Sequence, residues 1–136
     1  MIRVVLDTNV LVAAARASRS ASRKIVVACL EARVGAVVSR DLQREYDLIL
    51  SQALRGISYV KQLARLIEMS ERVEPEFVPR VVPDDADDDK LVALAIAAKV
   101  DALVTSDKHL KSLCLADNIL ILSPEETLTR FLQIAS

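Results

Sequence analysis

The sequence predicts an α/β fold with a mainly parallel central sheet, and its middle part carries the clearest signal. The run KLVALAIAAK at 90–99 is polar only at its two lysines and is rich in strong helix formers, so we expect a largely buried helix. The segment DALVTS at 101–106 is short and apolar with Val and Thr, which is typical of a strand buried on both faces. The chain is 52% hydrophobic with two glycines and four prolines, which indicates a helix-rich globule with short loops.

The first half of the chain is expected to contain two strands and four helices. An apolar strand over 2–6 ends at Asp7, and a helix over 8–17 follows. Helical spacing of apolar residues predicts further helices over 20–33, 40–54 and 59–72, with Gly35 ending the first of these and a second strand over 36–39. The inward positions expected in the last two helices are Leu42, Tyr46, Ile49, Leu50, Ala53, Val60, Leu63, Leu66, Ile67 and Met69. No strand separates these two helices, so we expect a helical hairpin over one side of the sheet.

The second half is expected to add three strands, which makes about five in all. The Pro-interrupted segment 74–82 is an edge strand or extended connector. It lies close in sequence to the acidic cluster, so it should form a lip of the crevice that holds these acids. A helix over 89–99 and a strand over 102–106 form the central unit, and a short helix over 108–116 comes next. After a strand over 119–122, a closing helix over 123–134 begins with Ser at the cap, Pro first and Glu third. The 136 residues show no repeat or linker, so 1–136 is expected to be a single domain.

Three aspartates are expected to meet at one edge of this sheet. The helix over 89–99 climbs roughly 16 Å at 1.5 Å per residue, and the strand over 102–106 returns roughly 17 Å at 3.3 Å per residue. Asp107 at the strand's carboxyl end should therefore lie level with Asp89 at the helix's amino end. Asp7 ends another buried strand, where open α/β folds place their sites. Its alternative role is to cap the helix that follows, a role that Thr8 or Asn9 could also fill.

Glu45 is the fourth acidic candidate. It falls on or beside the apolar stripe of its helix, one to two turns above the carboxyl edge of the preceding strand. A glutamate between Leu42 and Ile49 is costly if it is buried without a partner. The alternative is a solvated side chain that pairs with Arg44 or Arg55.

Four converging carboxylates repel one another and require a counter-charge. Two unit charges 4 Å apart cost on the order of 4 kcal/mol at an effective dielectric of about 20. A divalent cation offsets this repulsion, and a set of ligands that are all oxygen atoms favours Mg²⁺ or Mn²⁺ over Zn²⁺. Such a site activates water and stabilises the charge that develops on a displaced phosphate. The chemistry predicted is therefore metal-assisted hydrolysis of a phosphodiester.

On these residues the chain resembles the PIN-domain family of ribonucleases, in particular the VapC-like toxins of toxin–antitoxin systems. The resemblance is carried by LDTNVLVAA, SRDLQREYDLIL, DDDKLVALAIAAKVDALVTSDKHL and ILILSPEETL, which together span nearly the whole chain. It places the family's four acids on Asp7, Glu45, Asp89 and Asp107 and suggests supporting roles for Thr8, Asn9, Thr105 and Asp88. It implies a Rossmann-like three-layer α/β/α fold, dependence on Mg²⁺ or Mn²⁺, cleavage of single-stranded RNA, a cognate antitoxin and a homodimer.

Two departures from the family pattern bear on the metal site. Asp87 and Asp88 compete with Asp89 for the third position, and Asp89 is chosen because it directly precedes the apolar helix and keeps the family's interval to Asp107. His109 stands where many relatives carry a further acid. A second metal ion is therefore expected to be held weakly or only with substrate.

The charge is distributed unevenly and leaves a second function class open. Residues 1–65 hold eleven Lys or Arg against five acids, a balance of +6, whereas 66–136 hold seven against fourteen, a balance of −7. A basic half could bind RNA while the acidic half holds a cation, or the charges could simply lie on solvated helix faces. The alternative to an enzyme is thus an inactive PIN-fold module that binds RNA or a partner protein. A phospho-acceptor receiver domain ranks low, because it needs a paired acid after the first strand and a Lys after the last.

The cysteines and the N-terminus suggest a cytoplasmic protein. Cys29 and Cys114 lie in apolar helical contexts without a second Cys or His at metal-ligand spacing, so buried reduced thiols are expected. The sequence begins directly with a strand and lacks a basic segment followed by a long apolar stretch. Neither export nor membrane insertion is therefore expected.

Overall fold

The fold is a five-stranded sheet between two layers of helices. The structure is a computed structural model, and it describes residues 1–76, 86–112 and 119–133. The strands are β1 (Ile2–Leu6), β2 (Val34–Val38), β3 (Glu71–Arg72), β4 (Ala102–Val104) and β5 (Leu120–Leu122). The helices are α1 (Thr8–Arg16), α2 (Ala21–Leu30), α3 (Arg40–Ser51), α4 (Val60–Met69), α5 (Ala86–Ala98), α6 (Lys108–Lys111) and α7 (Pro124–Thr127), which continues as a π-helix (Leu128–Leu132).

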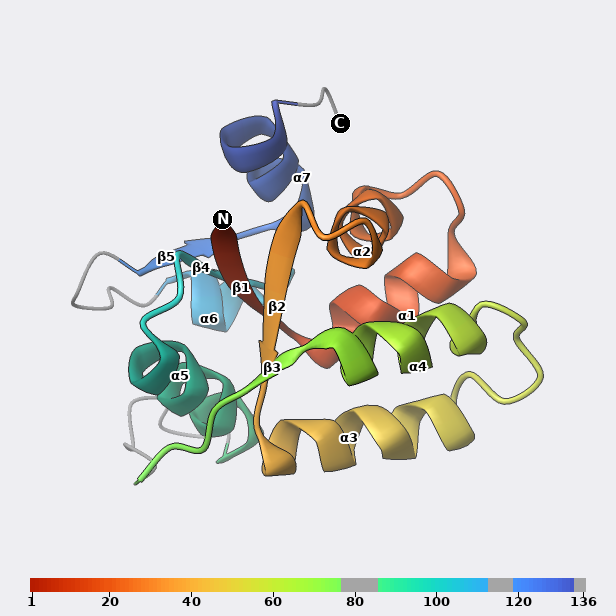
Figure 1. Cartoon of the computed structure of the whole chain (residues 1–136), viewed down its shortest axis with the longest axis horizontal. Helices are drawn as coiled ribbons and strands as arrows, with labels where there is room; N and C mark the ends of the chain where they lie inside the picture. The colour runs from red at the N-terminus through yellow and green to blue at the C-terminus, as the bar shows by residue number, and fades with distance from the viewer. Residues whose placement is uncertain (77–85, 113–118, 134–136) are drawn as a thin grey trace.

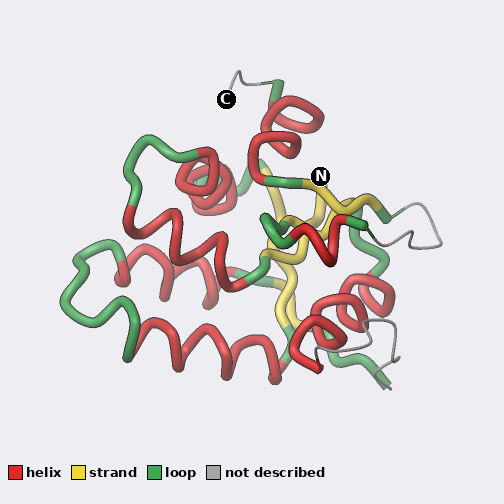
Figure 2. Tube along the Cα trace, turned by 180° about the vertical axis from the view of Figure 1, so that it is seen from behind, coloured by secondary structure: helices red, strands yellow, loops and turns green. Residues whose placement is uncertain are grey.

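All strand pairs in the sheet are parallel, and the order is β3-β2-β1-β4-β5. The central strand is β1, whose Val4 pairs with Ala36 of β2 on one side and with Ala102 of β4 on the other. Helices α1 to α4 lie on one side of the sheet and α5 and α6 on the other (Figure 1). Seen from behind, the strands run between these helix layers (Figure 2). The expected Rossmann-like three-layer α/β/α arrangement with a mainly parallel sheet is confirmed.

The core is aliphatic and holds the central strands rigidly. Val4, Val5 and Leu6 of β1 are at most 1% exposed, and all three residues of β4 are fully buried. On α5, the residues Leu91, Val92, Leu94 and Ala95 are at most 2% exposed, as expected for a buried helix. Burial of each of these Val and Leu side chains contributes about 1.5–3 kcal/mol. The strand ends that carry the candidate acids are therefore fixed by dense packing.

Serine caps define the starts of three helices. Ser20 and Ser39 accept hydrogen bonds from backbone amides of α2 and α3, at 3.1 Å in both cases. Ser123 and Glu126 form a complete capping box with Pro124 in the first turn of α7. The helix start predicted from Ser-Pro-Glu-Glu is confirmed, and Ser39 fixes where α3, the helix of Glu45, begins.

The end of α2 differs from the expectation. The helix stops at Leu30, and Ala32 adopts a left-handed conformation with φ 59°. Gly35 was expected to end this helix, but it lies inside β2, which begins at Val34. A non-glycine residue in the left-handed region is uncommon, so the sequence carries no signal for this earlier end.

The edge strand also lies earlier than expected. Helix α4 ends at Met69, and residues 71–72, expected to be helical, pair with Val37 and Val38 as β3. The expected strand segment from 77 to 82 lies outside the described residues. Two inward positions were wrong: Ala53 is exposed and Met69 is 47% exposed, whereas Leu54 is fully buried.

The remaining boundaries shift by a few residues. Helix α5 begins at Ala86 rather than 89, and β4 ends at Val104 rather than 106. Helix α6 ends at Lys111, and the rest of the helix expected over 108–116, including Cys114, falls largely outside the described residues. Cys29 is a buried free thiol, as expected. Within the described ranges no helix combines the length and the apolar character needed to cross a bilayer.

Candidate functional site

Asp7 and Asp107 lie at the same edge of the sheet, where β1 and β4 end. Leu6 pairs with Val104 in the parallel register, and the amide of Asp7 donates to the carbonyl of Val104 at 3.0 Å. Asp7 directly follows β1, and Asp107 follows β4 by three residues. We call this the carboxyl edge. The expectation that the chain brings these two acids to one edge is confirmed.

The hydroxyl of Thr105 links the two aspartates. Thr105 is fully buried, and its Oγ1 donates to Oδ2 of Asp7 at 2.6 Å. The same Oγ1 accepts from the backbone amide of Asp107 at 3.0 Å. One hydroxyl thus fixes the side chain of the first acid and the backbone of the other. A hydroxyl has one proton and two lone pairs, so it can serve both bonds at once.

Both aspartates also cap helices. Oδ1 of Asp7 accepts from the amide of Asn9 at 3.4 Å, and Oδ1 of Asp107 accepts from the amide of His109 at 2.8 Å. The alternative role of Asp7 as a helix cap is therefore confirmed. In each carboxylate the cap occupies one oxygen, so the helix cap and a functional role are compatible.

Glu45 turns toward the start of α1. It is half-buried, and its Oε2 accepts a hydrogen bond from the hydroxyl of Thr8, the residue after Asp7. The alternative partners are not used: within the described ranges, neither Arg44 nor Arg55 forms an ion pair with Glu45, and Arg44 pairs with Asp41 at 3.8 Å. The fourth acidic candidate is thus tied to the same strand–helix junction as Asp7.

Tyr46 is a site residue that sequence reasoning placed only in the core. It is 2% exposed, and its hydroxyl donates to the carbonyl of Leu6, the last residue of β1. Burial raises the pKa of Tyr46 well above 10, and the negative charges of Asp7 and Glu45 raise it further. A tyrosine on an apolar stripe signals such a contact, because a buried hydroxyl needs a partner.

Among the described residues, the acids of the carboxyl edge have no basic partner. Burial raises the pKa of Asp7 above 3.8, the hydrogen bond from Thr105 opposes this shift, and the charge of Asp107 adds to it. Within the described parts of the chain, no Lys, Arg or His forms an ion pair with Asp7, Glu45 or Asp107. A cation would relieve this charge, and carboxylate oxygens suit Mg²⁺ or Mn²⁺.

At the third acidic position the structure describes the backbone but not the side chains. Asp88 and Asp89 lie near the start of α5, but their side chains, like that of Asp87, fall outside the described residues. Among the described side chains, no three Asp, Glu, His or Cys residues form a group that could hold a metal ion. His109 is exposed, and its backbone amide, not its ring, contacts Asp107.

A cavity of about 320 Å³ opens between the start of α3 and α5. It is lined by Ser39, Arg40, Asp41, Glu74, Pro75, Lys90 and Ala93. Glu74 holds the start of α3, because its Oε1 accepts from the amide of Arg40 at 2.8 Å. The segment at 74–75 thus forms one wall of a crevice, in line with the lip that was expected there.

Comparison with known proteins identifies related folds. A family model described as PIN domain matches residues 3–109. The crystal structure of VapBC2 from Rickettsia felis, bound to a DNA fragment from their promoter, contains a chain similar to this one with a TM-score of 0.61 and 13% identity, over 90% of this chain and 98% of that chain. The crystal structure of PAE2754 from Pyrobaculum aerophilum matches with a TM-score of 0.56 and 14% identity, over 98% of this chain and 91% of that chain. No curated protein matches the sequence significantly.

Proposed function

Because this chain belongs to the PIN-domain family, we propose that it is a metal-dependent endoribonuclease that hydrolyses phosphodiester bonds of single-stranded RNA. One observation carries the proposal most directly. The buried hydroxyl of Thr105 joins Asp7 and Asp107 at the carboxyl edge, 2.6 Å from the carboxylate of the first and 3.0 Å from the amide of the second. Acids held together in this way, without a basic partner among the described residues, are suited to bind a divalent cation.

The proposed roles follow from where each acid lies. Asp7, Asp89 and Asp107 would hold Mg²⁺ or Mn²⁺, and Glu45 would hold the ion or orient water. The ion supplies Lewis acidity, which activates water and stabilises the charge that develops on the phosphate. The acids orient the reacting groups, and the buried floor of the site limits access of bulk solvent to them.

Four further side chains would support these acids. Thr105 favours the ionised form of Asp7 by donating to it. Thr8 orients Glu45 through its hydroxyl. Asn9 and Asp88 are proposed as further supports at the starts of α1 and α5.

The biological setting belongs to the same proposal. The likeness to a chain of VapBC2 supports a role as the toxin of a toxin–antitoxin pair with a cognate antitoxin protein. We further propose a homodimer located in the cytoplasm, with 1–136 acting as a single PIN domain.

The experiment compares two aspartates at opposite ends of the same strand. Asp107→Asn keeps the oxygen that accepts from the amide of His109, so the fold should persist. Cleavage of a labelled single-stranded RNA with Mn²⁺ should fall on the order of 100-fold or more, since a lost metal ligand removes several kcal/mol of transition-state stabilisation. The matched control is Asp101→Asn, whose side chain accepts from the amide of Arg3 at 2.9 Å before β4 begins. Equal cleavage by both variants and the unaltered protein would remove Asp107 from the mechanism.

A binding module without catalysis is the second candidate. It is favoured by the charge balance of +6 over residues 1–65, which could hold RNA without any catalysis. Such a module would retard labelled RNA in a native gel and leave its length unchanged over hours with millimolar Mn²⁺. Cleavage that is lost in Asp107→Asn would contradict it.

A further inference from the structure

Two stretches of the chain carry basic residues without any acid. Residues 8–30 contain Arg16, Arg19, Arg23 and Lys24 and no Asp or Glu. Residues 48–67 contain Arg55, Lys61 and Arg65 and again no Asp or Glu. In a chain with 18 basic and 19 acidic residues, this separation concentrates positive charge on two segments.

The fold brings these two stretches together at one end of the molecule. A guanidinium nitrogen of Arg16, the last residue of α1, donates to the carbonyl of Ala53 at 3.1 Å. The guanidinium of Arg23 on α2 lies 3.4 Å from the centre of the Tyr59 ring. The turn between α1 and α2 thus lies beside the turn between α3 and α4 (Figure 1). We call this region the basic end; it comprises Arg16, Arg19, Arg23, Lys24, Arg55 and Lys61.

The charges of the basic end have no acidic partners in the part of the chain that the structure describes. Within the described ranges, none of its six residues forms an ion pair. Arg23 and Lys24 lie near the start of α2, where cations oppose the helix dipole. Arg23 is nevertheless held in place, because its Nε also donates to the carbonyl of Ala14 at 2.6 Å. The fold therefore positions cations at a helix start without an acidic partner among the described residues, which suits an anionic ligand.

Helices α1 and α3 connect the basic end to the carboxyl edge. Thr8 at the start of α1 contacts Glu45 in the middle of α3, and Arg16 at the end of α1 contacts Ala53 just beyond the end of α3. The two helices therefore run side by side in the same direction. The nine residues of α1 span about 13 Å at 1.5 Å per residue. In a stacked strand successive phosphates advance about 3.4 Å along the helix axis, so this distance corresponds to about four stacked nucleotides.

The exposed side of α1, which leads from one site to the other, carries no acidic residue. The positions of α1 that reach solvent are Asn9, Val12, Ala13 and Arg16, none of which is acidic. On α3, one turn beyond Glu45, Leu48 is 53% exposed. On α3 the exposed Asp47 is acidic, so an RNA strand that leaves the acidic edge would follow the acid-free exposed side of α1 to the basic end.

We propose that the basic end binds the phosphate backbone of the RNA substrate about four nucleotides from the bond that is cleaved. This inference rests on the proposed function and adds where the rest of the substrate lies. RNA is favoured over an acidic protein because a strand positioned at the acidic edge for cleavage must continue over a neighbouring surface, and α1 and α3 lead to this one. The binding is electrostatic and independent of base sequence.

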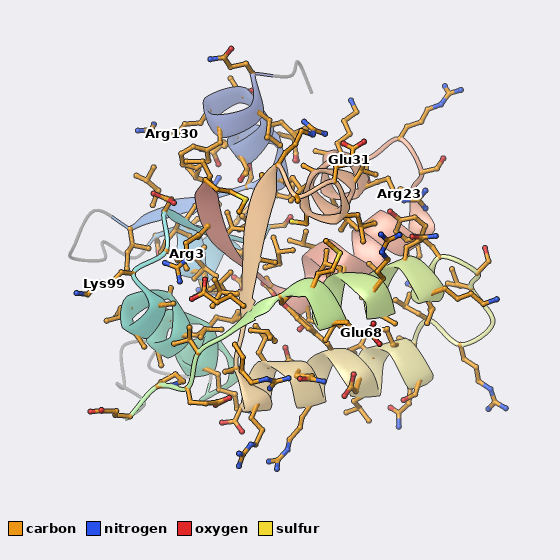
Figure 3. All side chains as sticks on the ribbon, viewed as in Figure 1. Arg3, Arg23, Glu31, Glu68, Lys99 and Arg130 are labelled. Carbon is orange, nitrogen blue, oxygen red and sulfur yellow. The ribbon has the colours of Figure 1, made fainter. Side chains whose placement is uncertain are left out.

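The test removes three charges whose side chains form neither a hydrogen bond nor an ion pair with any described residue. The variant is Arg19→Gln/Arg55→Gln/Lys61→Gln. The probe is a fluorescein-labelled oligouridylate of twelve nucleotides, and its fluorescence anisotropy is measured in EDTA at several salt concentrations. The control removes three charges elsewhere, in Arg33→Gln/Lys99→Gln/Arg130→Gln; Figure 3 shows Lys99 and Arg130 on the opposite side of the molecule from Arg23.

The expected result is a loss of affinity that depends on salt. Each phosphate contact on a single strand contributes about 0.7 to the slope of log K against log salt concentration. The triple variant should therefore lower this slope by about 2 and weaken binding 10- to 100-fold at 0.1 M salt, and its KM for the twelve-nucleotide RNA should rise while kcat is kept. The control should change neither quantity by more than about twofold.

The outcomes separate this inference from the proposed function. If the unaltered protein cleaves RNA with Mn²⁺ but the triple variant binds and cleaves equally well, the basic end has no role and the nuclease proposal stands. If the basic end binds RNA but no condition yields cleavage, the inference stands and the nuclease proposal fails. If poly-glutamate of equal charge binds as tightly as RNA and loses affinity in the triple variant, the surface serves an acidic protein and the RNA assignment is overturned.

Discussion

The link between the two aspartates can be tested by removing one hydroxyl. Thr105→Val keeps the size and shape of a fully buried side chain, so no cavity forms. It deletes the hydrogen bond to Oδ2 of Asp7, and a bond to a charged group contributes about 1.5–3 kcal/mol. It also deletes the acceptor for the half-buried amide of Asp107, worth about 0.5–1.5 kcal/mol. The expected decrease in the free energy of unfolding is therefore about 2–4.5 kcal/mol.

A second buried threonine provides a matched control. Thr127 is 1% exposed, and its hydroxyl donates to the carbonyl of Ser123 at 2.8 Å. That carbonyl also accepts from the Thr127 amide at 2.9 Å, so Thr127→Val leaves it satisfied and should cost about 1 kcal/mol or less. Urea denaturation followed by circular dichroism at pH 7, in EDTA, measures both variants.

The pH dependence identifies the carboxylate as the cause. The Thr105 hydroxyl stabilises the ionised form of Asp7, so its loss matters most above the raised pKa of Asp7 and less when the carboxyl is protonated. The difference in stability between Thr105→Val and the unaltered protein should therefore shrink as the pH falls toward 3.8. A Thr105→Val variant within about 0.5 kcal/mol of Thr127→Val at pH 7 would refute the reasoning, as would a loss that is the same at both pH values.

Three further changes have expected outcomes. Folding raises the pKa of Asp7, so the stability gained from its protonation is complete below the pKa of the unfolded state and is lost as the pH rises through the pKa of the folded state. Asp7→Asn should therefore increase the urea midpoint at pH 7 in EDTA and abolish cleavage. An unchanged or lower midpoint would contradict the burial argument. Tyr46→Phe removes the hydrogen bond to the Leu6 carbonyl and should lower the free energy of unfolding by about 1–2 kcal/mol in the same assay. It should also lower kcat with little change in RNA affinity. A variant with full stability and full kcat would show that the contact has no role. Burial raises the pKa of Cys29 to about 12. In a Cys114→Ser background, iodoacetamide at pH 8 should therefore label the Cys29 thiol only after the protein unfolds. Rapid labelling of the folded protein would show that the thiol is accessible.

The features predicted correctly are those that depend on local pattern. The strand over 2–6 followed by an acid, the buried helix before β4, and the capping serine of α7 each follow from residues adjacent in sequence. Parallel strands then bring their carboxyl ends to one edge, so the meeting of Asp7 and Asp107 follows from topology alone.

The features that were missed depend on distant contacts. The strand β3 consists of Glu71 and Arg72 only and exists because β2 offers a free edge; Arg3 from β1 also binds Glu71 at 2.8 Å. The hydroxyl of Tyr46 finds its partner 40 residues away. Periodicity identified this side chain as buried but could not say what its polar end would contact, because that depends on tertiary packing.

The central claim is that the acids of the carboxyl edge form one site for a divalent cation. Thermal melting with and without Mn²⁺ tests this claim before any RNA target is known. A ligand at about 100 times its Kd stabilises the folded state by roughly 2.7 kcal/mol, which for a chain of this size raises Tm by about 10 °C. The account predicts such an increase for the unaltered protein and for Asp101→Asn, and none for Asp107→Asn. An unchanged Tm in millimolar Mn²⁺, or an equal increase in all three proteins, would contradict it.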